Sequence, residues 1–535
     1  MFCLFFNAKT KEVHALNGSG RAAKNSTLAQ VRKQLGLKPG EVDQIPTLSA
    51  LATTVPGAAA GWVDTVEKFG SGKVNMMDIL TPAIELGENG FPVSELSAVF
   101  WANSEDSIRN ASPNFREMLK RDPKAEHYAR APKAGEIMKN PTLAKTFRAV
   151  AEQGKAGFYS GRIAKALVDV VQMLDGHLTL DDLKYHMETG STCADPISLK
   201  FRGQSIGKGS QPKTDGVADG SRFVEVWEHP PNGQGIVALM ALGILEKLEE
   251  DRKIMTFSQE DHNSTPYLHA IIESLRIAFS DANWWVTDPD FSPVKPDQLI
   301  SKEYLAERAK LFNPEGVSQP SHGYPGKSPA HNHSDTVYFA VTDKEGNGMS
   351  FINSNYSGFG TCIIPEGCGF TLQNRGSNFE LGPEGHPNIY APGKRPYHTI
   401  IPGMLTEGEG EDRELHSVYG VMGGFMQPQG HVQVLMNMEV FGMNPQQALD
   451  APRICIGAGM PESGQVISST VYAEEGIEKE AIAGLKKLGH NVKVVKGWNR
   501  GQFGRGQIIR SHHDDGQIVF SGGSDPRGDG CAMPA

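Results

Sequence analysis

The sequence predicts an α/β protein with a helix-rich first part and a strand-rich second part. Apolar residues recur at helical spacing in the middle of the chain, and an alternation of apolar and polar residues replaces this spacing from residue 336 onward. Glycine accounts for 60 of the 535 residues, about 11% against a usual 7%, and its excess after residue 345 indicates many tight turns. The predicted helices cover residues 145–152, 162–174, 235–249 and 267–281.

A hairpin is predicted where the pattern changes. Residues 336–342 and 349–356 alternate as two strands, and Lys-Glu-Gly-Asn at 344–347 forms the turn between them. The preceding segment, residues 316–335, is rich in Ser, Pro, Gly and His and has no periodicity, which is the composition of a flexible connector. The sequence therefore predicts that Thr336 opens a strand directly after a loop.

Composition narrows the class of protein. The net charge is -10 and Lys and Arg are scattered, so no basic stripe is present for nucleic acid. The mean hydropathy is -0.35, and no run approaches the roughly 18 apolar residues of a membrane span. The apolar opening at residues 2–6 has no basic residue before it, unlike a signal peptide, and a cytoplasmic location is expected. The six cysteines are widely spaced, so neither a metal site nor a disulfide framework is expected.

The junction before Thr336 offers a nucleophile of an unusual kind. The chain lacks the G-x-S-x-G, H-E-x-x-H and G-x-x-x-x-G-K-[ST] motifs of common hydrolases and nucleotide-binding proteins. A hydroxyl needs a base within hydrogen-bond reach. Cleavage between Asp335 and Thr336 would give Thr336 an α-amino group with a pKa of about 7.7 to 8.0, so the residue would carry its own base. The simpler alternative is an ordinary strand threonine.

Short motifs along the chain carry information about its family. Residues 334–347 read Ser-Asp-Thr-Val-Tyr-Phe-Ala-Val-Thr-Asp-Lys-Glu-Gly-Asn, a threonine followed by an alternating strand and a D-x-x-G-N turn. The other motifs are Pro56-Gly57 with Ala60-Gly61, Phe158-Tyr159 with Gly161, residues 230–235 (Pro-Pro-Asn-Gly-Gln-Gly), Lys394-Arg395-Pro396, Gly423-Gly424, Ala451-Pro452-Arg453 and Ser524-Asp525-Pro526-Arg527. In this order they resemble the γ-glutamyltranspeptidase family over essentially the whole chain.

The resemblance implies a fold and a maturation step. It implies a four-layer αββα sandwich of the N-terminal-nucleophile hydrolases, with helices outside two mostly antiparallel sheets. Residues 1–335 correspond to the large subunit and residues 336–535 to the small subunit, which begins with the nucleophile Thr336. We expect the two cleaved fragments to stay associated as one interwoven domain, and no cofactor is required. The family segment that precedes the strand at residues 1–6 has no counterpart here, so an N-terminal truncation is expected.

The resemblance also assigns two supporting roles. Attack on an amide carbonyl creates an oxyanion, which main-chain N–H groups stabilise where the chain approaches closely, as glycine permits. The family's oxyanion hole corresponds to Gly423 and Gly424, which lie between a predicted strand at 417–421 and a helix beginning near Pro428. Ser354 corresponds to a second hydroxyl residue that supports the nucleophile. Without the resemblance, a glycine pair is more simply a turn and Ser354 an exposed strand residue.

The expected substrate-binding positions depart from the family pattern. The acidic position that binds an α-ammonium group corresponds to Asn378, and a nearby glutamine corresponds to Arg375. The paired serines correspond to His398 and Thr399, and an asparagine corresponds to Tyr356. The arginine that binds the α-carboxylate corresponds to Ser19, with Arg21 two residues away.

Arg375 attracts a carboxylate and repels an ammonium group, whereas Asn378 offers no charge to an ammonium. The surrounding strings are more similar to the glutathione-hydrolase-like and cephalosporin-acylase branch of the family. A structural salt bridge is the alternative role of Arg375.

These observations lead to one expected function and two alternatives. The expected function is a γ-glutamyl amide hydrolase or transferase acting on a small amide, such as glutathione or a γ-glutamyl or glutaryl compound, through an acyl-enzyme on Thr336. The first alternative is an acylase for glutaryl-type amides. The second is an uncleaved, non-catalytic homologue. No nucleic-acid, membrane or metal partner is expected.

Overall fold

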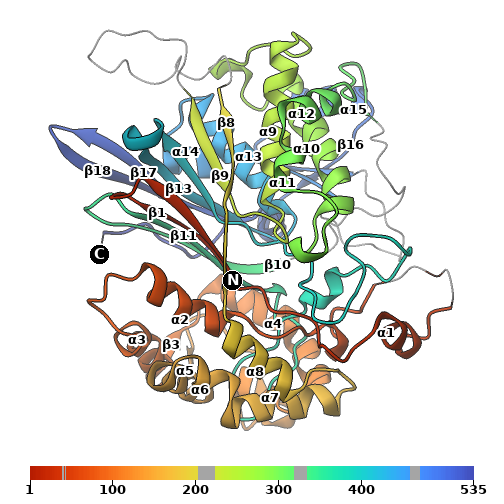
Figure 1. Ribbon diagram of the computed structural model, residues 1–535, viewed down its shortest axis with the longest axis vertical. Helices are drawn as coiled ribbons and strands as arrows, with labels where there is room; N and C mark the ends of the chain where they lie inside the picture. The colour runs from red at the N-terminus through yellow and green to blue at the C-terminus, as the bar shows by residue number, and fades with distance from the viewer. Residues whose placement is uncertain (39–40, 42–43, 203–222, 319–333, 458–469, 535) are drawn as a thin grey trace. The chain divides into compact units, whose positions relative to one another are not determined.

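The computed structural model describes residues 1–38, 41, 44–202, 223–318, 334–457 and 470–534 (Figure 1). The chain divides into two compact units. Unit 1 consists of Met1, Leu16–Cys193 and Asn353–His398, and unit 2 consists of Phe2–Ala15, Ala194–Ile352 and Thr399–Ala535. Each unit draws on both sides of residue 335. The division at that residue stays a prediction about cleavage, and residues 319–333 of the predicted connector lie outside the described residues.

Unit 1 is built mainly from helices, most of them packed around its main apolar core, and it contains two smaller apolar clusters. Ile163, Leu167 and Val171 recur at four-residue spacing on α7 and are buried in that core. Figure 1 shows α2, α3, α5, α6, α7 and α8 gathered side by side. The helices are α1 (Leu28–Gln34), α2 (Ala58–Phe69), α3 (Met76–Asn89), α4 (Glu95–Ala111), α5 (Pro141–Gln153), α6 (Lys155–Tyr159), α7 (Gly161–Met173) and α8 (Leu180–Thr189).

Two motifs of the sequence meet inside this core. The hydroxyl of Tyr159, at the end of α6, donates to the carbonyl oxygen of Pro56 at 2.7 Å and accepts from the amide of Ala60 at 3.0 Å. The Pro-Gly turn and the Phe-Tyr-x-Gly motif therefore hold each other in place. Short strand pairs and 3-10 helices complete the unit: β3 (Phe91–Pro92) with β6 (Ile137–Met138), β4 (Lys120–Arg121) with β5 (Ala129–Arg130), η1 (Ala50–Ala52), η2 (Phe115–Met118), η3 (Glu126–Tyr128) and η6 (Arg375–Asn378).

Two sheets dominate the strand-rich part of the fold. The first has the order β10-β11-β1-β2-β7, and the second has the order β18-β17-β13-β12-β9-β8. The first contains β10 (Ser334–Thr342), β11 (Gly348–Ser357), β1 (Phe2–Asn7), β2 (Glu12–Asn17) and β7 (Thr192–Ala194). The second contains β18 (Gln517–Ser524), β17 (Arg505–Asp514), β13 (Glu414–Met422), β12 (Gly403–Glu407), β9 (Val224–Glu228) and β8 (Ile197–Phe201), and all its printed pairings are antiparallel.

The two sheets pack face to face within unit 2. Leu4 and Phe6 of β1 share a buried cluster with Trp227 of β9, Met404 of β12 and Val418 of β13. The same unit holds a small sheet in the order β14-β15-β16, formed by β14 (Ile454–Ile456), β15 (Thr470–Glu474) and β16 (Asn491–Val495). It also contains the 3-10 helices η7 (Gly410–Asp412) and η8 (Gly497–Phe503).

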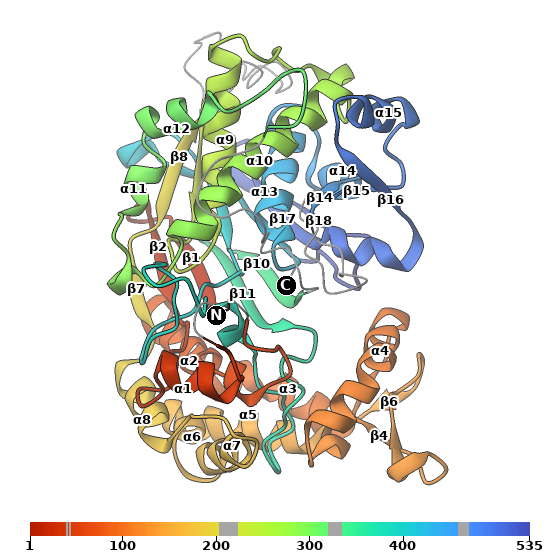
Figure 2. The same cartoon turned by 90° about the vertical axis from the view of Figure 1, so that its right-hand side faces the viewer.

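Helices of unit 2 contact the strands of the six-stranded sheet, with α9 against β8 and β9 and α13 against β13 (Figure 2). Helix α9 is buried on nearly all sides, so its residues are apolar around its whole circumference. None of the helices in the described ranges combines the length and hydropathy of a membrane-spanning helix. The helices are α9 (Gly235–Glu250), α10 (Thr265–Trp285), α11 (Pro296–Leu299), α12 (Lys302–Ala309), α13 (Met426–Glu439), α14 (Pro445–Asp450) and α15 (Lys479–Lys487).

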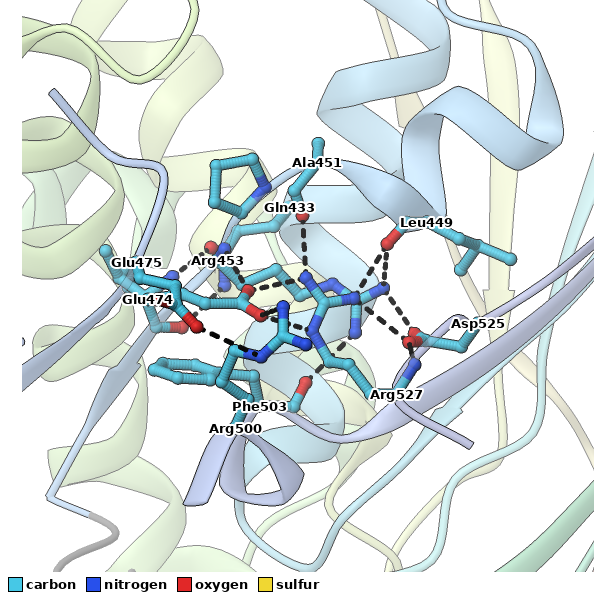
Figure 3. A network of polar contacts seen from close by, with 12 residues as sticks. Gln433, Leu449, Ala451, Arg453, Glu474, Glu475, Arg500, Phe503, Asp525 and Arg527 are labelled. Carbon is cyan, nitrogen blue, oxygen red and sulfur yellow. Dashed lines mark hydrogen bonds and ion pairs between the residues drawn. The ribbon is translucent and has the colours of Figure 1, made fainter. Parts of the chain in front are cut away.

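A buried ionic network fixes the C-terminal segment of unit 2 (Figure 3). Arg453 donates to Asp525 at 2.7 Å, to the carbonyl oxygen of Phe503 at 3.0 Å and to that of Leu449 at 3.1 Å. Arg527 pairs with Asp525 and with Glu474. Removing Asp525 would leave Arg453 as a buried charge without its ion-pair partner, which typically costs about 3 to 5 kcal/mol, whereas Arg527 would keep Glu474.

The predicted elements are confirmed with small shifts. Helices α5, α9 and α10 cover their predicted segments and extend beyond them. Helix α7 covers its predicted segment except for the last residue, Leu174. The predicted hairpin is β10 and β11, but β10 begins at Ser334 rather than Thr336. The bond between Asp335 and Thr336 therefore lies inside a strand of the uncleaved chain, not at the loop-to-strand junction that the sequence predicted.

Candidate active site

Thr336 lies on the buried face of β10. It is 5% exposed, whereas the next residue, Val337, is 68% exposed, as expected where successive side chains point to opposite faces of a strand. Tyr338 shares the face of Thr336 and packs in an apolar cluster with Phe2 and Met422. The strand that carries the expected nucleophile thus packs against the end of β13.

Tyr338 shows how closely these two strands approach. A Cβ atom added to Gly420 would lie 2.4 Å from the Tyr338 ring, so only glycine fits at this position of β13. The hydroxyl of Tyr338 forms a hydrogen bond with Ser350 Oγ at 3.0 Å. β13 then runs from Gly420 to Met422 and delivers the glycine pair on the next two residues.

Gly423 and Gly424 form the turn between β13 and α13. Their φ angles are 140° and 58°, values that side-chain-bearing residues rarely adopt. The amide of Met426 donates to the carbonyl oxygen of Gly423 at 3.0 Å, and that of Gln427 donates to Gly424 at 3.1 Å. Within the described ranges, the two glycine amides themselves have no acceptor in the protein. Such amides can stabilise an oxyanion.

Gln234 clamps this turn, a role that the sequence alone did not reveal. Its fully buried Nε2 donates to the carbonyl oxygen of Gly424 at 2.9 Å and to that of Thr399 at 2.7 Å. The Pro-Pro-Asn-Gly-Gln-Gly motif was interpretable only as a turn. Its single glutamine, placed directly before the long apolar helix α9, was the one available signal, because such a buried amide needs partners.

In unit 1, Ser354 and Tyr356 lie near the end of β11. The hydroxyl of Ser354 accepts from the amide of Tyr356 at 2.8 Å. Tyr356 is 3% exposed and has a φ angle of 82°. A left-handed conformation at a non-glycine residue is strained and is found most often at functional sites. The backbone conformation of Tyr356 is therefore held by the surrounding structure rather than by its own preference.

Arg375 and Asn378 share one face of the 3-10 helix η6. Side chains three residues apart eclipse each other in a 3-10 helix. The Arg375 guanidinium lies 5.2 Å from the centre of the Tyr356 ring. The Nδ2 of Asn378 is buried without a hydrogen-bond partner among the described residues. A cation and an amide donor on one face suit a carboxylate oxygen, whereas an ammonium group would need acceptors.

Burial governs the electrostatics of Arg375. It lowers the pKa of Arg375 to about 9, and the Tyr356 phenol is the group that acts in the opposite direction. Burial also lowers the pKa of Arg453, which is paired with Asp525, so a structural salt bridge stays the alternative role of Arg375. A carboxylate beside this guanidinium would raise its pKa again.

The expected site residues fall in both units. Thr336, Thr399, Gly423 and Gly424 belong to unit 2, and the main chain of Asp335 belongs to β10 there. Ser354, Tyr356, Arg375, Asn378, His398 and Arg21 belong to unit 1. The structure brings Thr336 to a strand packed on the one that ends at the glycine pair, and it brings Arg375 together with Tyr356 and Asn378. His398 is 4% exposed, and Thr399 contributes its carbonyl oxygen to the Gln234 clamp.

Two packed sheets with flanking helices, a buried threonine on the edge strand β10, and a glycine turn at the end of the strand that packs on β10 are typical of the N-terminal-nucleophile hydrolases. The family model of Gamma-glutamyltranspeptidase matches residues 1–535. The chain belongs to the γ-glutamyltranspeptidase family.

Known relatives support this placement. The Glutathione hydrolase-like YwrD proenzyme of Bacillus subtilis (strain 168) is 32% identical over 535 residues, covering 99% of this chain and 89% of that protein. The Oxamate amidohydrolase proenzyme of Klebsiella pneumoniae is 29% identical over 521 residues, covering 97% of this chain and 86% of that protein. The crystal structure of cephalosporin acylase from Bacillus halodurans matches with a TM-score of 0.79 and 34% identity, covering 99% of this chain and 85% of that chain. The predicted family and fold class are confirmed.

Proposed function

We propose that this chain is an amide hydrolase or transferase of the γ-glutamyl or glutaryl type that acts through an acyl-enzyme on Thr336. Membership of the γ-glutamyltranspeptidase family supports amide chemistry. The similar proteins are named as a glutathione hydrolase-like proenzyme, an oxamate amidohydrolase proenzyme and a cephalosporin acylase. One observation carries the proposal furthest: the buried Thr336 lies on a strand packed against β13, and β13 continues into two glycine amides that have no acceptor in the described part of the protein.

The proposed reaction uses groups of the protein alone. After cleavage, Thr336 Oγ1 attacks the carbonyl carbon of the amide, and the new α-amino group of Thr336 accepts the hydroxyl proton. The amides of Gly423 and Gly424 stabilise the oxyanion. As the intermediate collapses, the carbon–nitrogen bond breaks and the proton passes to the departing amine. Water or an acceptor amine then attacks the acyl-enzyme and releases Thr336.

Arg375 and Asn378 favour an acyl group that ends in a carboxylate. The guanidinium can bind a carboxylate with two hydrogen bonds, and Asn378 Nδ2 adds a donor on the same face of η6. This observation favours the glutaryl acylase as a second candidate, since an α-ammonium group would lose water without meeting an opposite charge.

Strand pairing explains how two fragments would stay together. β1 precedes the proposed cut and pairs with β11, which follows it, with Phe2 opposite Ile352. β9 pairs in the same way with β12, with Glu228 opposite Gly403. Because each sheet joins strands of both fragments through one such pairing, cleavage would break one peptide bond and leave these two pairings intact. We propose that the mature protein consists of both fragments.

The test is a comparison of two threonines on β10. Thr336→Ala should abolish both cleavage and turnover of γ-glutamyl and glutaryl anilides, because it removes the hydroxyl that attacks both bonds. Thr342→Ala, a matched change at the end of the strand, should retain both. Release of aniline by the Thr336→Ala protein at a substantial rate would require a different nucleophile. A stable, uncleaved wild-type chain without activity would favour the non-catalytic homologue.

A further inference from the structure

A buried pair of one carboxylate and one imidazole lies among the elements that form the glycine turn. Glu228 is the last residue of β9 and His431 lies on α13, and both side chains are fully buried. Glu228 Oε1 lies 2.7 Å from Nδ1 of His431, a distance at which the imidazole N–H donates a hydrogen bond to the carboxylate. The reaction proposed for Thr336 uses neither side chain, so the pair calls for another role.

The pair joins the two chain segments on either side of the turn. The chain that follows β9 carries Gln234, whose side chain clamps the turn. This segment folds back tightly, because a Cβ atom added to Gly235 would lie 2.8 Å from the Cβ atom of Glu228. Helix α13 begins directly after the turn and carries His431. The hydrogen bond therefore links the segment that clamps the turn to the helix that follows it.

Two tyrosines extend this contact to the strand of the proposed nucleophile. The ring of Tyr419 on β13 lies 4.8 Å from the ring of His431. Tyr338 shares the buried face of β10 with Thr336. Burial raises the pKa of both phenols, and the negative charge of Glu228 raises it further. Parts of β9, β10, β13 and α13 thus meet around one polar cluster.

Stability alone does not account for this pair. Burial raises the pKa of Glu228, with His431 and Tyr419 acting in the opposite direction, because the ionised carboxylate loses its water. His431 Nε2 is buried and has no hydrogen-bond partner among the described residues. An apolar pair of similar size often stabilises a fold at least as well as a buried charge pair, whereas a short hydrogen bond also fixes the distance between two elements. The pair is therefore better suited to positioning than to stability.

We propose that Glu228 and His431 are positioning residues that hold the glycine turn against the strand that carries Thr336. The inference rests on the proposed function, in which the pair touches neither the substrate nor the reacting atoms. It acts through the orientation of the amides of Gly423 and Gly424. Loss of the pair should therefore affect the transition state more than it affects substrate binding.

Steady-state kinetics of the cleaved protein test this role. Glu228→Gln keeps the shape of the side chain and removes its charge, so kcat should fall by about tenfold with little change in KM, less than for the loss of an oxyanion donor. Asp281→Asn is the matched control, because Asp281 forms a buried ion pair with Arg308 at 2.7 Å between α10 and α12, which contribute no residue to the turn. The control should lower the melting temperature without a selective loss of kcat.

A double variant separates position from stability. Glu228→Met with His431→Leu replaces the pair by apolar side chains, and its melting temperature should lie closer to that of the wild type than the melting temperature of Glu228→Gln does. Its kcat should stay as low as that of Glu228→Gln, because the directional contact is lost. Recovery of kcat together with the melting temperature would overturn the proposal, and so would equal losses of kcat in Glu228→Gln and Asp281→Asn.

Hydrogen exchange of the uncleaved chain tests the same role without turnover. In the full chain carrying Thr336→Ala, adding Glu228→Gln should speed the exchange of main-chain amides at residues 420–428 and leave those of α10 unchanged, whereas Asp281→Asn should do the opposite. Unchanged exchange at residues 420–428 in Glu228→Gln would overturn the positioning role. A wild type without amidase activity would contradict the proposed function instead, and the exchange measurement would still decide the role of the pair.

Discussion

The expected reaction groups in unit 2 and the expected selection groups in unit 1 are held in different ways. The glycine amides belong to the main chain, and their turn is held by the fully buried Gln234. In unit 1, the groups are the side chains of Arg375 and Asn378 on a four-residue 3-10 helix. In the proposed reaction, the chemistry would depend on the position of the backbone, whereas the choice of substrate would depend on side chains that single substitutions can exchange.

After the loss of the proposed nucleophile Thr336, the largest expected effect comes from replacing Gln234, whose side chain holds the glycine turn. Gln234→Leu removes both hydrogen bonds to the carbonyl oxygens of Gly424 and Thr399, so the glycine turn loses its fixed orientation. We expect kcat to fall by about tenfold to a hundredfold, less than the loss of an oxyanion donor itself, with little change in KM. Steady-state kinetics on a γ-glutamyl or glutaryl anilide measure both constants.

Gln433→Leu is the matched control for this variant. Gln433 is also buried and also donates to two carbonyl oxygens, those of Gln429 at 2.9 Å and Ile454 at 3.0 Å, but it lies on α13 away from the glycine turn. It should lower the melting temperature without a selective loss of kcat. Equal kinetic losses in the two variants would mean that Gln234 acts only through stability.

A smaller effect is expected from exchanging the selection groups. Asn378→Asp offers a charge to an α-ammonium group, and a charged hydrogen bond is worth about 1.5 to 3 kcal/mol. The ratio of kcat/KM for γ-glutamyl over glutaryl anilide should therefore rise by about tenfold or more. Arg375→Gln should weaken glutaryl cleavage in parallel. A strong γ-glutamyl preference of the wild type that Asn378→Asp leaves unchanged would remove both residues from the acyl pocket.

The pKa of Arg375 adds a pH test to the same comparison. Because that pKa is lowered to about 9, the guanidinium is charged near pH 7 and loses its proton as the pH rises through 9. The KM for a glutaryl anilide should rise over this interval in the wild type. The rise should be absent from Arg375→Gln, whose side chain does not titrate. Parallel curves for the two proteins would contradict a role of Arg375 in binding.

The smallest expected effect concerns a buried polar cluster of unit 2 that resembles a metal site. Its groups partner one another: His269 Nδ1 lies 2.8 Å from His490 Nε2, and Arg276 donates to Glu273 at 3.0 Å and faces His490 Nδ1 at 3.3 Å. Glu273 also accepts from the amide of Ser318 at 2.6 Å. The cluster is therefore expected to stabilise the fold rather than to bind a metal.

Burial lowers the pKa of His490 to about 3, and Arg276 and His269 add to the shift. The unfolded chain takes up this proton at about pH 6.5, so stability is full above that value and falls as the pH drops toward 3. We expect a loss of about 1 to 2 kcal/mol between pH 6.5 and 4 after solvent screening. Thermal melts of His490→Gln should show a shallower dependence, whereas His14→Gln, at a half-exposed histidine, should match the wild type.

The sequence predicted those parts of the fold that rest on local pattern. Helical spacing predicted α5, α7, α9 and α10, and alternation predicted the β10–β11 hairpin. The glycine pair was correctly expected between a strand and a helix, because the residues before it have the pattern of a strand and those after it have the pattern of a helix. The predicted start of β10 was two residues too late. The polar residues before Thr336 show no alternation of apolar and polar residues, although their main chain belongs to the strand.

Other features depend on contacts between distant residues and have no local signature. Gln234 meets carbonyl oxygens 165 and 190 residues away, so its motif predicted only a turn. Arg375 and Asn378 share a face because the chain makes a helical turn there, and Gly376 and Ser377, which separate the two residues, do not predict such a turn. The amide of Lys24 donates to Asp182 of α8, 158 residues further along the chain.

The central claim is that Thr336 becomes the amino-terminal nucleophile of a cleaved, interwoven protein, and the direct measurement is the amino-terminal sequence of its smaller fragment. Dividing 58.0 kDa in proportion to 335 and 200 residues gives fragments of roughly 36 and 22 kDa on a denaturing gel. The account predicts that the smaller fragment begins Thr-Val-Tyr-Phe and co-purifies with the larger one under native conditions. Active protein that runs as one intact band, or a small fragment that begins at another residue, would contradict it.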